Sequence, residues 1–285
     1  MDRRTFLKSL GIYLISQQFG IHGTSWALAP AATPAPSLLD SPASHQTIDN
    51  RGALGQIQEV VLSSGDRKTL ETVLARFARI QATVGQGNFC LLGFDDSLRI
   101  ARGYQRVGAF SDRELTFIDK LFHTDARDYG FKGRKLFHNI TNTIHGPKVN
   151  KIPGTGNYLY NGSSFKLYQR LRRDIGDQLI LTAGIRGVAK QFYLFLKKAV
   201  HSRGNLSVAS RSLAPPGYSY HGVGDFDVGQ VGYGAANFTE KFSRTKIYRN
   251  ITQLDYVIFR YPRNNHVGVQ FEPWHIQVDR SNKRA

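Results

Sequence analysis

Two short segments in the last quarter of the sequence hold an unusual density of side chains that can bind a metal ion. The first is APPGYSYHGVGDFDVG, residues 214–229, and the second is FEPWHI, residues 271–276. Catalytic zinc takes three protein ligands, often histidine nitrogens and a carboxylate oxygen, and leaves one position for water. His221, Asp227 and His275 could supply that set of donors if the fold brings the two segments together.

Glu272 is a candidate general base for such a site. It stands three residues before His275, and a carboxylate close to a metal can take a proton from an attacking water. The intervening Pro273 argues against a regular helix or an inner strand, because proline has no N–H to donate. We therefore expect a bent backbone that turns Glu272 and His275 toward one point.

Each segment alone also has an ordinary structural explanation. A histidine close to aspartate and glycine residues is more often part of a loop hydrogen bond than a metal ligand. The run Glu-Pro-Trp-His could equally be the edge of a strand that carries a surface charge. Only the two segments together favour a catalytic site.

Taken together, the segments resemble the zinc D-alanyl-D-alanine carboxypeptidases of the VanY and VanX type. Residues 214–229 are similar to that family's Ser-x-His-x-x-Gly-…-Asp motif, and residues 259–278, FRYPRNNHVGVQFEPWHIQV, are similar to its closing hairpin. Residues 181–191, LTAGIRGVAKQ, resemble a third motif that carries an arginine and a glutamine. The three motifs follow the family order, and the resemblance covers about residues 155–279.

The resemblance implies one zinc ion held by His221, Asp227 and His275. It implies Glu272 as the catalytic base and Arg186 as the cation that steadies the scissile carbonyl or its oxyanion. The side chains that it places against the substrate are Ser219, Gln191 and Trp274.

The sequence departs from the family pattern at several places, among them Ile185 and Gly187, which stand where the family has a tyrosine before its arginine and a serine after it. Six positions separate His221 from Asp227, where the family usually has seven, so Asp225 is a rival for the carboxylate ligand. Tyr220 stands where the family has a glutamate after the serine. These departures bear on substrate preference more than on metal binding.

The reaction implied by the resemblance is hydrolysis of the terminal peptide bond of a peptidoglycan stem peptide, most simply a D,D bond. The same site could instead serve an endopeptidase or an L,D-carboxypeptidase. A third alternative is a non-catalytic, zinc-stabilised wall-binding module, as hedgehog-type relatives of this fold suggest. Glu272 and Arg186 argue against that alternative, because a purely structural zinc site has no use for a base.

Composition narrows the partners and the kind of metal site. The formal net charge of +17 suits an anionic partner, such as peptidoglycan or an envelope surface. Nucleic acid is not expected, because no helix-turn-helix, RNP-like or zinc-finger pattern is present. A single cysteine, Cys90, excludes an internal disulfide and a multi-cysteine metal site, which leaves His, Asp and Glu as ligands.

The start of the chain resembles an export signal. Residues 2–8, DRRTFLK, are similar to the twin-arginine motif, and the Ala-Leu-Ala at residues 27–29 is a plausible cleavage site. We expect residues 1–29 to be a twin-arginine signal peptide that directs the protein to the periplasm or another extracytoplasmic space. Residues 30–47, rich in Ala, Pro and Ser, read as a flexible linker. The mature chain contains no apolar run of about 18 residues, so no membrane span is predicted.

Apolar periodicity predicts the remaining elements. Helices are expected over residues 66–84, 112–129, 164–174 and 188–200, and strands over residues 178–182, 256–261 and 267–271. The stretch 203–234 holds too many glycines for a helix. Because helices and hairpins are segregated, we expect an α+β fold of the carboxypeptidase and hedgehog-like type, a small antiparallel sheet with flanking helices. A helical N-terminal extension over residues 48–150 would precede a zinc peptidase core over residues 151–285.

Overall fold

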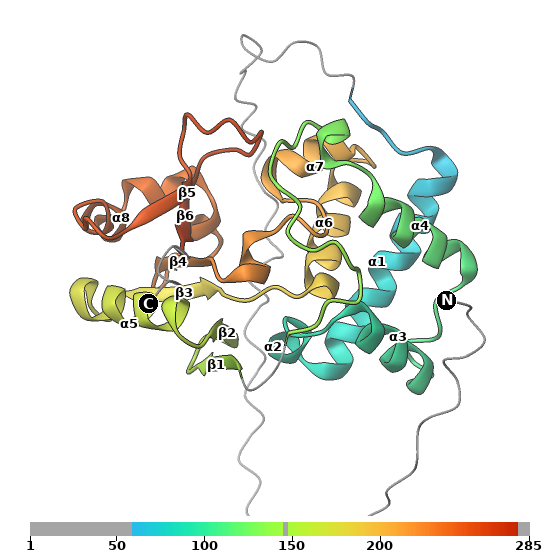
Figure 1. The fold of residues 1–285 in the computed structure, drawn as a ribbon, viewed down its shortest axis with the longest axis horizontal. Coiled ribbons are helices and arrows are strands. Elements are labelled where there is room, and N and C mark those ends of the chain that lie inside the picture. Colours follow the sequence, from blue (N-terminus) through green and yellow to red (C-terminus); the bar gives the residue numbers. More distant parts are fainter. Residues whose placement is uncertain (1–58, 145–147, 279–285) are drawn as a thin grey trace, which may run out of the picture. The chain divides into compact units, whose positions relative to one another are not determined.

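Residues 59–144 and 148–278 are described by the computed structural model (Figure 1). The expected signal peptide, residues 1–29, and the expected linker, residues 30–47, lie outside the described residues. Within the described ranges, no helix combines the length and the apolar character needed to cross a bilayer.

Helices make up most of residues 59–144, and the main sheet forms after residue 148. The α-helices are α1 (Ser64–Val84), α2 (Gln86–Phe89), α3 (Phe94–Gly103), α4 (Asp112–His123), α5 (Ser163–Ile175), α6 (Val188–His201), α7 (Leu206–Ser212) and α8 (Lys246–Ile251). The 3₁₀-helices are η1 (Ala126–Tyr129), η3 (Tyr220–Val223), η4 (Gly234–Phe238) and η5 (Glu240–Arg244). The strands are β1 (Val149–Ile152), β2 (Asn157–Tyr160), β3 (Leu179–Ala183), β4 (Phe226–Gln230), β5 (Ile258–Tyr261) and β6 (Glu272–Gln277).

Four antiparallel strands form the main sheet in the order β3-β4-β6-β5 (Figure 1). A separate antiparallel hairpin pairs β1 with β2. The two central strands, β4 and β6, come from the two segments that carry the candidate ligands. The expected α+β fold, with a small antiparallel sheet and a helical N-terminal region, is confirmed.

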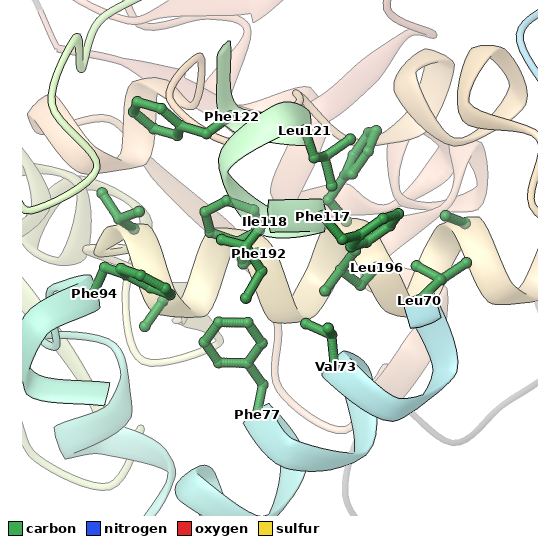
Figure 2. Packing of buried hydrophobic residues seen from close by; sticks show 14 of the residues in the cluster. Leu70, Val73, Phe77, Phe94, Phe117, Ile118, Leu121, Phe122, Phe192 and Leu196 are labelled. Atoms are coloured by element: carbon green, nitrogen blue, oxygen red, sulfur yellow. The ribbon is translucent and has the colours of Figure 1, made fainter. Parts of the chain in front are cut away.

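A first hydrophobic core joins the early helices to helix α6. Leu70 and Phe77 lie on the buried face of α1, at the three- and four-residue spacing of an amphipathic helix. The ring of Phe77 stacks on Phe192 of α6, with ring centroids 5.9 Å apart (Figure 2). Residues on both sides of position 150 therefore share one core, so the extension expected over residues 48–150 packs directly on the expected peptidase region.

A second hydrophobic core holds the sheet in register. Tyr168 and Leu171 of α5 pack in it with Phe226 of β4 and Ile276 of β6. Phe226 and Ile276 are partners across the β4-β6 ladder. Each of these two core residues is the direct neighbour of a candidate ligand, so burial of the apolar pair also fixes where the ligands lie.

The bounds of most expected helices match the structure within two residues, but one expected helix is longer than the observed one. The matching helices are α1, α5 and α6. The helix expected over residues 112–129 is wrong in its last third, because α4 ends at His123 and a 3₁₀ turn, Ala126–Tyr129, follows. The Asp125 side chain accepts a hydrogen bond from the backbone N–H of Arg127, which caps the new turn and interrupts the α-helix.

The prediction that the glycine-rich stretch 203–234 holds no helix was also wrong in part. Helix α7 occupies Leu206–Ser212, seven residues that include no glycine. The side chain of Asn205 accepts a hydrogen bond from the N–H of Val208 and so caps the first turn. The count of glycines over the whole stretch hid this short glycine-free segment.

The strand that returns after β5 was expected over residues 267–271, and that boundary is wrong. The return strand, β6, runs from Glu272 to Gln277. The preceding residues use their backbone groups elsewhere, since the carbonyl of Val267 accepts from Lys132 N–H and Gln270 N–H donates to Arg211. Gly268, with φ of 82°, also turns the chain out of an extended conformation there.

Candidate active site

The three candidate ligands meet where β4, β6 and η3 come together. Asp227 and His275 are register partners across the β4-β6 ladder, and His221 lies in η3, just before β4. One ligand atom from each residue lies within 4.8 Å of the other two. The Oδ1 atom of Asp227 is 3.2 Å from Nε2 of His221 and 3.4 Å from Nδ1 of His275. All three side chains are buried.

Hydrogen bonds fix which nitrogen of each histidine faces the centre of the cluster. Nδ1 of His221 lies 2.8 Å from the carbonyl oxygen of Gly184, which can only accept, so Nδ1 carries the hydrogen. Nε2 of His275 lies 3.2 Å from a carboxylate oxygen of Asp225, so that nitrogen carries the hydrogen there. The remaining nitrogens, Nε2 of His221 and Nδ1 of His275, therefore face Asp227.

This arrangement fits a metal ion better than it fits a hydrogen-bonded cluster. Nε2 of His221 and Oδ1 of Asp227 are buried and have no hydrogen-bond partner in the described structure. A buried polar atom without a partner costs about 1–3 kcal/mol. Two nitrogens and one carboxylate oxygen are the donors that a catalytic zinc ion takes, and a cation between them would satisfy both orphaned atoms.

A bulge in β6 brings Glu272 to the same point. Phe259 pairs with Ile276 and Tyr261 pairs with Glu272, so three residues of β6 stand opposite one residue of β5. The bulge turns Glu272 and His275 toward each other, with Oε2 of Glu272 3.2 Å from Nδ1 of His275. The expected bend is therefore present. The expectation that Pro273 keeps this segment out of an inner strand was wrong, because β6 is an inner strand whose irregular ladder does not need the missing donor.

Arg186 lies beside the cluster, in the loop after β3. Its Nη2 donates to Oδ2 of Asp227 at 2.8 Å, so it holds the carboxylate oxygen that faces away from the two histidines. The Arg186 side chain is 14% exposed, whereas that of Asp227 is 1% exposed. The Arg186 side chain is thus closer to the solvent than the carboxylate that it holds.

The surroundings set the charge of each group in the cluster. Burial and the Arg186 cation lower the pKa of His221 to about 4, so that this imidazole is neutral. Burial opposes ionisation of Asp227, but His221 and Arg186 outweigh it and lower the pKa of Asp227 to about 2. Burial raises the pKa of Glu272, which favours a role in holding a proton.

His275 behaves differently from His221. Burial works to lower its pKa, but hydrogen bonds to Asp225 and Glu272, with the nearby charge of Asp227, raise the pKa to about 9. The metal-free cluster therefore carries a proton on each nitrogen of His275. Because Asp225 holds the Nε2 hydrogen, the proton that a metal would displace is the one on Nδ1.

The residues expected to contact substrate lie in three different settings. Ser219 is buried directly before η3, and its carbonyl accepts from the N–H of Gly222. Gln191 is buried on α6 and donates to the carbonyl of Ala214, while its Oε1 has no hydrogen-bond partner among the described atoms. Trp274 packs in the second core. Their contact with substrate stays a prediction.

Asp225, the rival ligand, lies on the far side of the His275 ring. Asp227 takes the place in the cluster, and Asp225 faces the opposite nitrogen of the histidine. Two neighbours of the site were not expected from the sequence: Arg260, which pairs with Asp225, and Tyr261, whose ring meets His275 edge-on at 5.0 Å. Both residues lie within the closing-hairpin motif, and that position could have indicated that they are close to the site.

A family model independently covers this part of the chain. The model described as "VanY: D-alanyl-D-alanine carboxypeptidase" matches residues 163–278, which include every residue of the cluster. The match to the VanY family model therefore concerns residues 163–278 and not the chain as a whole. The histidine and aspartate cluster inside the matched segment is a group of side chains that could hold a metal ion. The helices before residue 163 lie outside the matched segment.

Solved structures give a weaker likeness. A variant of the vancomycin resistance D,D-pentapeptidase VanY in complex with Zn(II) is 24% identical, with a TM-score of 0.36, over 46% of this chain and 77% of that one. The LD-carboxypeptidase LdcB is 24% identical, with a TM-score of 0.37, over 45% of this chain and 62% of that one. The D,D-dipeptidase VanXYg is 20% identical, with a TM-score of 0.39, over 45% of this chain and 52% of that one. No curated protein sequence matches the chain. Because these TM-scores are low, the likeness to the family depends on the match of the family model to residues 163–278.

Proposed function

We propose that the protein is a zinc-dependent carboxypeptidase that hydrolyses the terminal peptide bond of peptidoglycan stem peptides, with a D,D bond as its substrate. The observation that carries the proposal is the convergence of His221, Asp227 and His275, two of whose facing atoms are buried without partners, with Glu272 beside them. A structural zinc site is closed by four protein ligands and has no adjacent base. This cluster has three ligands and a neighbouring carboxylate, which is the arrangement of a catalytic site.

The side chains divide the chemical work. A zinc ion at this site would supply Lewis acidity, which polarises a carbonyl oxygen and lowers the pKa of a water molecule. Glu272, whose pKa burial raises, accepts the proton of the attacking water and returns it to the leaving amine, a role worth about 10²–10⁴ in rate. Arg186 has five N–H donors, so it can hold Asp227 and still donate to the oxyanion as charge develops.

Activity on defined muropeptides tests the proposal. Purified protein would be incubated with a pentapeptide stem that ends in D-Ala-D-Ala, a tetrapeptide stem with an L,D terminal bond, and a cross-linked dimer. We expect release of one D-alanine from the pentapeptide, detected by mass analysis, and loss of that activity after chelation and its return with zinc. Cleavage of only the tetrapeptide or only the dimer would instead identify an L,D-carboxypeptidase or an endopeptidase. Stable zinc binding without cleavage of any substrate would favour a wall-binding module.

We also propose that the protein is exported to the periplasm, or to an equivalent extracytoplasmic space, by the twin-arginine route. The DRRTFLK motif at residues 2–8 supports this proposal, as does the location of peptidoglycan outside the cytoplasm. The net charge of +17 suits contact with an anionic envelope surface. Replacing Arg3 and Arg4 together by lysine should keep the protein in the cytoplasm, as measured by cell fractionation, and unchanged export of that variant would contradict the proposal.

A further inference from the structure

Asp225 is a buried carboxylate with an unusually complete set of partners. It is 2% exposed. Its two oxygens accept from Nε and Nη2 of Arg260, at 2.7 and 3.1 Å, and from the backbone N–H of Val278 at 2.9 Å. The remaining contact of Oδ2 is with Nε2 of His275, at 3.2 Å. Asp225 therefore links β5, the end of β6 and one candidate ligand.

The backbone around Asp225 is held as firmly as its side chain. Its N–H donates to the carbonyl of Tyr220, at the start of η3. The guanidinium of Arg260 lies over the ring of Tyr220, 3.8 Å from the ring centroid. A single unit made of Asp225, Arg260 and Tyr220 therefore ties the segment that carries His221 to the strand that carries His275.

These contacts decide how His275 is oriented. An ionised carboxylate only accepts hydrogen bonds, so the hydrogen of His275 must sit on Nε2 when it faces Asp225. The other nitrogen, Nδ1, is then the one available to a metal, and it faces Asp227 and Glu272. A carboxylate behind a metal-binding histidine fixes the ring and makes the facing nitrogen a stronger donor.

We infer that Asp225 and Arg260 are positioning residues that hold the His275 ring with Nδ1 toward the metal and thereby set the affinity of the site. The inference depends on the proposed function, because it requires a metal at His221, Asp227 and His275. It goes further by assigning a task to a carboxylate that is not a ligand. It also explains why an acidic residue can be kept two positions before the ligand Asp227 without competing for the metal.

Zinc affinity and stability, measured together, separate positioning from an ordinary structural role. Asp225→Asn keeps the size of the side chain but removes its charge and its bidentate pairing with Arg260. We expect the zinc dissociation constant, measured by competition with a chromogenic chelator, to rise about 10–100-fold. We also expect the visible absorption spectrum of the cobalt-substituted protein to change, because the histidine is held less firmly.

The matched control is Glu114→Gln. Glu114 accepts three hydrogen bonds from Arg76, at 3.3, 3.1 and 3.0 Å, and its side chain is similarly buried, but it lies in the helical extension. Both variants should lower the melting temperature of the metal-free protein, and only Asp225→Asn should weaken zinc binding. Zinc affinity within twofold of wild type in a folded Asp225→Asn protein would overturn the inference.

Two further outcomes are decisive. If Asp225→Asn does not fold, Arg260→Lys replaces it, since lysine keeps the charge but cannot make the bidentate pair. A severalfold loss of zinc affinity in Arg260→Lys would support the inference, and unchanged affinity would overturn it. If wild-type protein itself binds no zinc, the proposed function fails and the inference fails with it, whereas normal wild-type binding with an unaffected variant overturns the inference alone.

Discussion

At the scale of single residues, the proposed mechanism assigns binding of the metal and transfer of the proton to different side chains. His221, Asp227 and His275 direct their donor atoms at one another, while Glu272 lies 3.2 Å from Nδ1 of His275 as a neighbour. The two tasks can therefore be removed independently by substitution.

Glu272→Gln should keep the metal and lose the reaction. The amide has the shape of the carboxylate but cannot take a proton, so we expect one zinc per chain and a kcat lower by about 10²–10⁴. Metal analysis and steady-state kinetics on the same preparation measure both quantities. His275→Ala is the comparison, since it should lose zinc and activity together. A Glu272→Gln protein with more than a tenth of the wild-type kcat would remove Glu272 as the base.

Lys190 provides a pH prediction away from the metal. It is 5% exposed, and burial lowers its pKa to about 8, although Gln81 accepts its hydrogen bond. Because the unfolded chain binds this proton more tightly, the destabilising effect is fully present below pH 8 and disappears as the pH rises toward about 10.5. The unfolding free energy of wild type should therefore rise relative to Lys190→Met between pH 8 and 10, as measured by denaturant titration. Parallel pH profiles for the two proteins would contradict this assignment.

At the scale of elements, the turn after β3 positions two functional groups at once. The carbonyl of Gly184 accepts a hydrogen bond from Nδ1 of His221, and Arg186 follows two residues later. A Cβ at Gly184 would lie 2.0 Å from the carbonyl oxygen of Tyr158 in β2, so only glycine fits there. The close contact with β2 therefore determines where the turn after β3 lies.

Gly184→Ala should damage stability and the metal site together. The clash is with backbone, so β2 and the turn must move apart, at a cost of about 1–3 kcal/mol, and zinc affinity should fall with the displaced His221. Gly103→Ala is the control, since a Cβ at Gly103 meets nothing within 4 Å. Denaturant titration and chelator competition measure the two effects. Wild-type zinc affinity in Gly184→Ala would mean that the turn does not position His221.

The candidate ligands could be predicted from the sequence, but some of the residues that orient them could not. Residue types and motif order pointed to His221, Asp227 and His275, and Pro273 alone indicated the bend that brings Glu272 to them. The task of Asp225 depends on which side of the His275 ring faces β4, and only the β4-β6 register determines that.

The misplaced return strand and the shortened helix have a shared cause. Apolar spacing favoured a strand over residues 267–271, but Lys132 and Arg211, both distant in sequence, take the backbone bonds there. The helix expected over residues 112–129 was interrupted by a local cap at Asp125 that apolar periodicity does not register. Periodicity shows which side chains are buried, and it does not show which backbone groups find partners.

At the scale of the whole molecule, the helices before the family domain share its core. Phe77 of α1 is fully buried and stacks on Phe192 of α6 (Figure 2). Helix α6 begins at Val188, directly after the loop that carries Arg186. The sequence could not show this packing, because the two rings are more than a hundred positions apart. The helices before residue 148 therefore support α6, the helix that follows the Arg186 loop.

Phe77→Ala should destabilise the entire protein while leaving the chemistry of the folded fraction intact. Removing a fully buried phenylalanine costs about 3–5 kcal/mol. Denaturant unfolding followed by a probe in each core should show one transition at lower denaturant, and kcat below that transition should be unchanged. A loss under 1 kcal/mol, or separate unfolding of the sheet, would show that the extension is an independent part.

The central claim is that one zinc ion lies between His221, Asp227 and His275. Anomalous diffraction at the zinc edge from crystals grown with zinc tests it most directly. We predict a single peak about 2.0–2.2 Å from Nε2 of His221, Oδ1 of Asp227 and Nδ1 of His275, with Glu272 outside the ligand set. A peak bound by Asp225 in place of Asp227, or no peak between the two histidines, would contradict the account.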